Sequence, residues 1–139
     1  TQKEYTLIKL TDNKNGNILG NSLYINWENS YAPTYIPHNY TIQNISNDGG
    51  KVKFIEYINK NTANKPITFI EMSTEAKGNV DTEDAKVVNI KIHNYDGILI
   101  EKNNLVSIIW HNNEYLFDLS GYEKPDEMLK IAESVKLLK

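Results

Sequence analysis

Short runs of β-branched and aromatic residues, separated by clusters of Asn, Asp and Gly, follow one another along most of the chain. Such runs predict β-strands, and the clusters between them predict the tight turns of an antiparallel meander. The expected strands are residues 5–10, 18–27, 40–45, 51–58, 67–72, 87–93, 98–102, 105–111 and 114–119. Turn-forming residues between the first two runs, and again between the third and fourth, predict two early hairpins.

Two longer connections interrupt this pattern. Glu28 to Asn39 contains Pro33 and Pro37, whose rings fix φ and remove hydrogen-bond donors, so a loop is expected there. Ala76 to Lys86 has no apolar period and is rich in acidic residues. We expect it to be a solvated loop that can include a short helical turn.

Only the end of the chain has helical periodicity. Its apolar residues at helical spacing are Met128, Ile131, Ala132, Val135 and Leu138. Pro125 suits the first helical position, and Asp126 and Glu127 place negative charge where the helix dipole is positive. Each large apolar side chain that this stripe buries contributes about 1.5–3 kcal/mol, so the helix should pack on the sheet. The predicted fold class is therefore α+β: a curved antiparallel β-sheet of about seven to nine strands with a C-terminal helix packed on one face.

The length and charge of the chain limit the classes of protein to which it can belong. The 139 residues fit a single domain, 1–139, in which residues 1–30 form an N-terminal hairpin or extension and 31–139 the core. All 15 basic residues are Lys and the net charge is −3, which argues against nucleic-acid binding. No apolar run approaches the roughly 20 residues of a membrane span, so contact with a membrane is expected only through an anchor upstream of this fragment.

The motifs of the common enzyme classes are missing. The sequence has no phosphate-binding glycine loop, dinucleotide fingerprint, nucleophile elbow or zinc-protease helix, and without Cys it has no thiol nucleophile. Of the three histidines, His93 is expected on the solvent face of its strand, and His38 and His111 lie next to a proline and a turn. We therefore expect no enzyme activity, no catalytic residue, no metal site and no cofactor.

One stretch is rich in aromatic residues interleaved with prolines. It consists of Trp27, Tyr31, Tyr35 and Tyr40. Amphipathic rings on a stiff loop make contact area at low entropic cost, so these four residues are the candidate ligand or partner surface. The alternative is that the rings cap the open end of the sheet.

The order of these residues resembles a bacterial family of domains of unknown function, the one numbered four-three-six-seven. The resemblance lies in residues 35–40, in the Val-x-Phe-x-x-Tyr-Ile-Asn strand Val52 to Asn59, and in the closing helix Pro125 to Val135; it extends from about Tyr31 to Leu138. It implies a location outside the membrane of Gram-positive bacteria, after an anchoring helix or a lipoprotein signal, and no established activity. A more distant similarity is to lipoprotein-carrier-like domains, whose curved sheet wraps around a helix and can shelter an acyl chain.

The expected function is that of a non-enzymatic, extracytoplasmic sensory or protein-interaction domain of a membrane-anchored protein or lipoprotein. The alternative is a carrier domain for a lipid or another apolar ligand, and the third candidate is a hydrolase with an unrecognised site. The partner is accordingly expected to be a protein or an apolar ligand.

Overall fold

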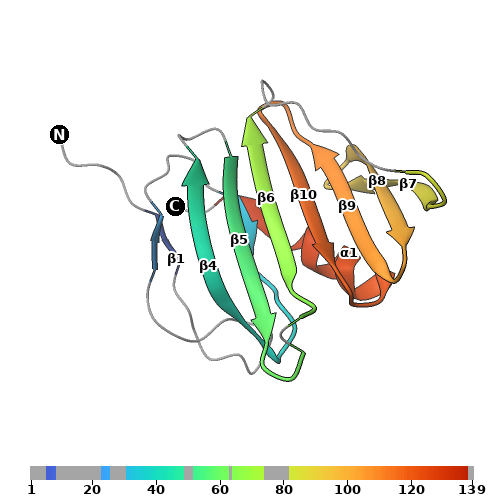
Figure 1. Ribbon diagram of the computed structural model, residues 1–139. Coiled ribbons are helices and arrows are strands. Elements are labelled where there is room, and N and C mark those ends of the chain that lie inside the picture. Colours follow the sequence, from blue (N-terminus) through green and yellow to red (C-terminus); the bar gives the residue numbers. More distant parts are fainter. Residues whose placement is uncertain are drawn as a thin grey trace.

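The main element of the fold is an open antiparallel sheet. A computed structural model describes residues 6–8, 23–25, 31–48, 52–62, 64–73 and 82–137. The strands, in their order across the sheet, are β4 (Tyr40–Asp48), β5 (Val52–Asn59), β6 (Ile67–Ser73), β10 (Tyr115–Gly121), β9 (Leu105–His111), β8 (Tyr95–Lys102) and β7 (Lys86–Ile92). Helix α1 (Pro125–Glu133) lies behind this sheet in Figure 1 and covers one of its faces. The predicted α+β class, an antiparallel sheet with a C-terminal helix on one face, is confirmed.

Tight turns join the strands of the second half of the sheet. The two turns are His93-Asn94 and Asn103-Asn104, and all four residues have φ between 51° and 69°. Two-residue hairpin turns require positive φ at both positions, which Asn tolerates better than most residues. The prediction that β7 reaches His93 and that β8 begins at Ile98 was therefore wrong: the turn comes earlier, and His93 is in it rather than on a strand face.

The core lies between the sheet and α1. Side chains alternate along each strand, so that β5 buries Ile55 and Tyr57 and β6 buries Ile67 and Phe69 on the helix side. From the helix, Met128, Ile131 and Ala132 are 0% exposed. This layer is the hydrophobic core that the helical stripe predicts.

Close packing explains two glycines. A Cβ on Gly97 would lie 2.7 Å from the Ile109 carbonyl oxygen and 2.8 Å from Trp110 Cβ, so a larger residue would push β8 away from β9. A Cβ on Gly121 would lie 3.1 Å from the Met128 sulfur. Both positions let a large core side chain approach a neighbouring backbone.

A second, two-stranded sheet lies on the same side as α1. It pairs β3 (Tyr31–Pro33) with β11 (Val135–Leu137) in antiparallel register. The loop predicted for Glu28–Asn39 is thus wrong at β3, where Pro33 is tolerated because it occupies the last position of a short strand.

The helix is shorter than its apolar stripe suggests. It ends at Glu133, and Val135 is buried from β11 rather than from a helix, while Leu138 lies outside the described residues. Ser134 terminates the helix: its hydroxyl donates to the Ile131 carbonyl at 2.6 Å and accepts from the N–H of Tyr35 at 3.0 Å. The chain then turns and extends along β3.

The remaining predictions fall partly outside the described residues. Of the first predicted hairpin, β1 (Thr6–Ile8) and β2 (Leu23–Ile25) are described and pair antiparallel. Of the acidic loop, residues 82–85 are described and form a turn before β7, which begins at Lys86 rather than after it. Among the described residues, α1 is too short and too polar to span a bilayer.

Candidate functional site

Three tyrosines gather at one end of the main sheet, and we call this region the tyrosine end. Tyr31 comes from β3, Tyr95 begins β8, and Tyr115 begins β10. The Tyr31 ring meets the rings of Tyr115 and Phe117 edge to face, with centroid distances of 5.8 and 5.2 Å. Tyr95 is 38% exposed, whereas Tyr31 and Tyr115 are half-buried. The tyrosine end is therefore a packed aromatic cluster with part of its surface open to solvent.

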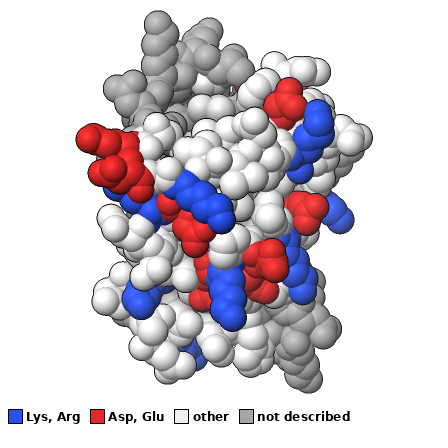
Figure 2. All heavy atoms as spheres, turned by 90° about the vertical axis from the view of Figure 1, so that its right-hand side faces the viewer, with Lys and Arg blue, Asp and Glu red and all other residues white. Residues whose placement is uncertain are grey.

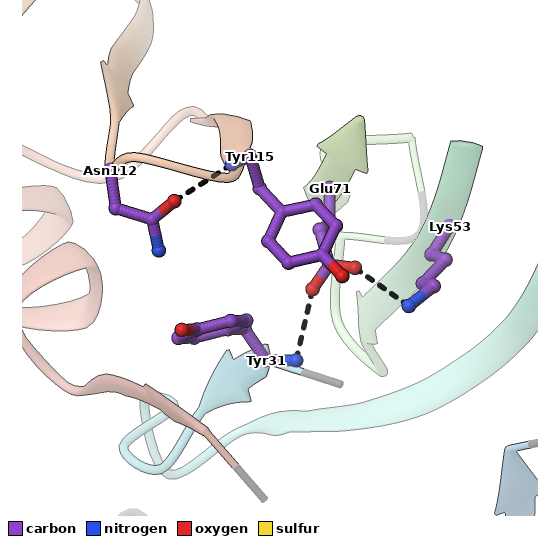
Figure 3. A network of polar contacts seen from close by, with 5 residues as sticks. All are labelled: Tyr31, Lys53, Glu71, Asn112 and Tyr115. Atoms are coloured by element: carbon purple, nitrogen blue, oxygen red, sulfur yellow. Dashed lines mark hydrogen bonds and ion pairs between the residues drawn. The ribbon is translucent and has the colours of Figure 1, made fainter. Parts of the chain in front are cut away.

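A buried ion pair lies directly beneath these rings. Lys53 Nζ is 2.8 Å from Glu71 Oε2, and the two side chains are 6% and 1% exposed. Figure 3 shows that the other oxygen of Glu71 accepts a hydrogen bond from the N–H of Tyr31, at 2.9 Å. Lys53 Nζ also lies 5.5 Å from the centroid of the Tyr115 ring, within the range of a cation–π contact. The pair thus ties β3 to the ends of β5 and β6.

The turn between β9 and β10 completes the tyrosine end. The side-chain oxygen of Asn112 accepts hydrogen bonds from the N–H groups of Glu114, at 2.8 Å, and Tyr115, at 2.7 Å. This Asx-type turn fixes where β10 begins and so positions the Tyr115 ring over Lys53.

Burial shifts the pKa values of two groups at the tyrosine end, Glu71 and Tyr31. Desolvation raises the pKa of Glu71 above its usual value, while Lys53 and the N–H of Tyr31 partly offset this effect and Glu114 adds to it. Burial also raises the pKa of Tyr31, with further contributions from the charges of Glu114 and Glu71. Ionising a carboxylate here is costly, and a buried ion pair seldom stabilises a fold more than apolar side chains of the same size. We therefore interpret the pair as a device that positions Tyr31.

The structure separates the residues of the sequence-predicted surface. Trp27 lies outside the described residues. Tyr31 belongs to the tyrosine end, whereas Tyr35 and Tyr40 contact α1 and the segment just before it. The Tyr35 hydroxyl donates to Glu127 Oε2 at 2.9 Å, and Lys130 Nζ lies 4.4 Å from the centre of its ring.

Tyr40 is 2% exposed, and its hydroxyl donates to Glu123 Oε2 at 2.9 Å. Burial, followed by these hydrogen bonds to carboxylates, raises the pKa of both Tyr35 and Tyr40 to about 12. The two rings thus fasten the segment after β3 to the start of the helix. The partner surface predicted from all four aromatic residues stays a prediction.

Sequence reasoning missed Lys53 and Glu71, although a signal was present. Lys53 lies two residues before Ile55 and four before Tyr57, so it shares their face of β5. Glu71 shares the face of Ile67 and Phe69 on β6 in the same way. A charged residue at an apolar position in both of two paired strands indicates a buried ion pair.

The other candidate groups lie elsewhere. His93 Nε2 donates to the Glu133 carbonyl at 2.6 Å, so this side chain contacts the C-terminal end of α1. Within the part of the chain that the structure describes, no three His, Asp or Glu side chains lie close enough to hold a metal ion. A surface hollow of about 260 Å³ lies at the opposite end of the sheet, and Lys65, Glu101 and Glu123 are among its lining residues.

These features define an α+β domain in which an open antiparallel sheet carries, on one face, a short helix and the two-stranded ribbon formed by β3 and β11. The family model described as domain of unknown function DUF4367 matches residues 30–135, and the chain belongs to this family. The resemblance to this family that the sequence analysis noted is thereby confirmed. No curated protein and no solved structure matches the chain.

Proposed function

We propose that this DUF4367 domain is a non-enzymatic binding module that acts outside the cytoplasm, as the sensory or protein-interaction part of a membrane-anchored protein or lipoprotein. The observation that carries the proposal is the tyrosine end, where a buried ion pair holds Tyr31 beside Tyr115 and where Tyr95 remains 38% exposed. Tyrosines are enriched at protein interfaces, because their rings make large contacts at low entropic cost.

The charge distribution near this site supports a protein as partner. Figure 2 shows lysines and acidic residues intermixed on the side of the molecule that carries β7 and β8. One exposed ion pair, between Lys91 and Asp96 at 2.9 Å, belongs to this side. A surface of mixed charge does not attract a polyanion, so it fits a polypeptide better than a nucleic acid.

The packing of α1 gives no support to the acyl-chain carrier. Met128 and Ile131 on the helix, and Ile108 and Leu119 on the sheet, are all 0% exposed and belong to one continuous core. The side chains of these described residues already fill the space in which an acyl chain would lie.

Site-specific crosslinking tests the binding role. A photoreactive phenylalanine analogue at position 95 of the full chain, in cells of the source organism, should yield one defined protein adduct. The control is the same analogue at Tyr122, which is 39% exposed but lies near the other end of β10. Adducts of equal yield at both positions, or none at position 95, would contradict the proposal.

Cysteine labelling tests the location. The sequence has no Cys, so Asn113→Cys adds a single thiol to this chain, at an exposed turn position. A membrane-impermeant maleimide should label this variant in intact cells. Labelling that requires lysis would refute the extracytoplasmic location.

A further inference from the structure

The outer edge of β7 is open to a further strand. Among the described strands, β7 has a neighbour on one side only, since it pairs with β8 at the end of the seven-stranded sheet, on the right in Figure 1. Val87 and Val88 are 45% and 41% exposed. Consecutive residues of a strand point to opposite faces, so a partner on one face would cover one valine. A partner that approaches along the edge would meet both.

The turn at the end of β7 determines which backbone groups point outward. A β-turn closes with a hydrogen bond between its first and fourth residues, so at His93-Asn94 the backbones of Ile92 and Tyr95 face each other. In an antiparallel pair this orientation alternates along the strand. The residues whose N–H and C=O groups point away from β8 are therefore Val87, Asn89 and Lys91. Such a row of alternating donors and acceptors is complementary to another β-strand.

The strand lacks the features that commonly protect a sheet edge. Its register with β8 is uninterrupted over seven residues, and it contains no proline. The strand at the other end of the sheet, β4, has a register shift between Ile42 and Asn44, and such bulges hinder further pairing. Lys91 does not protect the edge either, because its Nζ lies 2.9 Å from Asp96 on β8, away from the edge.

The sequence of β7 is complementary to itself in antiparallel orientation. When Asn89 lies opposite Asn89 of a second copy, Val88 lies opposite Ile90 and Val87 lies opposite Lys91. Val88 and Ile90 of both copies then form one apolar cluster on the α1 side, and no lysine lies opposite a lysine.

This register also pairs every outward backbone group. The three outward residues of one copy lie opposite the three of the other, and with two hydrogen bonds per pair the three pairs make six bonds. A register shifted by two residues would leave one outward residue of each strand without a partner in β7. Self-pairing centred on Asn89 thus satisfies the whole edge, which argues for a second copy as the occupant.

We propose that two copies of this domain associate through antiparallel pairing of their β7 strands, with Asn89 at the two-fold axis. The two seven-stranded sheets then form one continuous sheet, through an interface made of the same residues in both copies. This inference goes beyond the proposed function, because it concerns the edge of the sheet and does not depend on the tyrosine end.

Sedimentation velocity over a range of protein concentrations tests the inference. As the concentration rises, the chain of 139 residues should change from its mass of 16.0 kDa to twice that mass. Asn89→Pro removes an outward N–H group and no hydrogen bond to β8, so it should abolish the dimer. Circular dichroism and the thermal midpoint check that this variant is folded.

Charge substitutions test the register. Asn89→Lys places two lysines opposite each other and should weaken the dimer. Mixing this variant with Asn89→Asp pairs opposite charges, so the mixture should associate about tenfold more tightly than Asn89→Lys alone. Asn113→Lys is the matched control, because it adds the same charge at an exposed turn outside β7 and should leave the dimer unchanged.

The possible results separate this proposal from its alternatives. A monomer at every concentration, a dimer that Asn89→Pro leaves intact, or a mixture no tighter than Asn89→Lys alone overturns it. So does a wild-type chain that binds a different polypeptide through this edge and forms no dimer. Asn89→Pro should keep the crosslinked adduct at position 95, so this proposal and the proposed function can fail separately.

Discussion

Replacing Lys53 by Met should be among the most destabilising single changes in the domain. Glu71 is 1% exposed, and the substitution would leave its carboxylate with one hydrogen bond, from the N–H of Tyr31. Removing one partner of a buried ion pair costs about 3–5 kcal/mol, because the remaining charge stays desolvated. Most small domains have a stability of only about 5–15 kcal/mol, so the loss will be easy to measure.

The pH dependence of this variant carries a definite sign. In the wild type, desolvation already raises the pKa of Glu71 above its ordinary value of 4.5, although Lys53 lowers it. Without Lys53 the pKa rises further, so the folded state holds the proton more tightly than the unfolded chain. The variant should therefore be most stable below pH 4.5 and should lose stability as the pH rises through the raised pKa of Glu71.

Urea unfolding, followed by far-ultraviolet circular dichroism at several pH values, measures both effects. The double variant Lys53→Met and Glu71→Met removes both charges and should come within about 2 kcal/mol of the wild type, since only the N–H of Tyr31 then lacks its acceptor. Lys91→Met is a matched control, because Lys91 forms an exposed ion pair and its loss should leave the urea midpoint unchanged. If Lys53→Met costs less than about 1 kcal/mol at neutral pH, the reasoning about the buried pair is refuted.

Three further outcomes are expected. Gly97→Ala should lower stability by about 1–3 kcal/mol in urea unfolding, because the new methyl group would meet Trp110 Cβ at 2.8 Å; an unchanged midpoint would show that β8 can shift freely. Ser134→Ala should cost about 1–3 kcal/mol in the same assay, because the N–H of Tyr35 loses its acceptor; full stability would mean that the hydroxyl is replaceable by water. Since the pKa values of Tyr35 and Tyr40 are raised from 10.0 to about 12, folding stability that is complete below pH 10 should be lost between about pH 10 and 12. The double variant Tyr35→Phe and Tyr40→Phe should lose less across that range, and a slope equal to that of the wild type would contradict the assignment.

Strand patterns and turn chemistry predicted most of the main sheet. Alternation over residues 51–58 and 67–72 placed β5 and β6 within one or two residues of their bounds, because packing on one face and turn chemistry at the ends act locally. The pairing of β6 with β10 could not be predicted from local patterns. It joins residues about 50 positions apart, as in Glu71 opposite Phe117, and local patterns do not specify which strand becomes the neighbour.

The errors at β3 and at the end of α1 have one common cause. The stripe from Met128 to Val135 satisfies helical spacing, and Pro33 argues against a strand, so each local reading is reasonable alone. The contacts of Ser134 outweigh both local preferences. Its hydroxyl binds the carbonyl of Ile131 at the end of the helix and also the N–H of Tyr35, which follows β3. Tertiary contacts of this kind are not visible in either segment separately. The tyrosine end was missed for the same reason, because its residues come from β3, β8 and β10.

The pairing of β3 with β11 also determines how the domain would respond to mechanical tension. Tyr31 lies opposite Leu137, so these two residues stand at the same end of the ribbon. A pull transmitted through the backbone at these two residues would break the hydrogen bonds of the ribbon one after another, like a zipper, instead of loading them together in shear. The two-stranded ribbon would therefore separate at low force, while the seven-stranded sheet stayed intact.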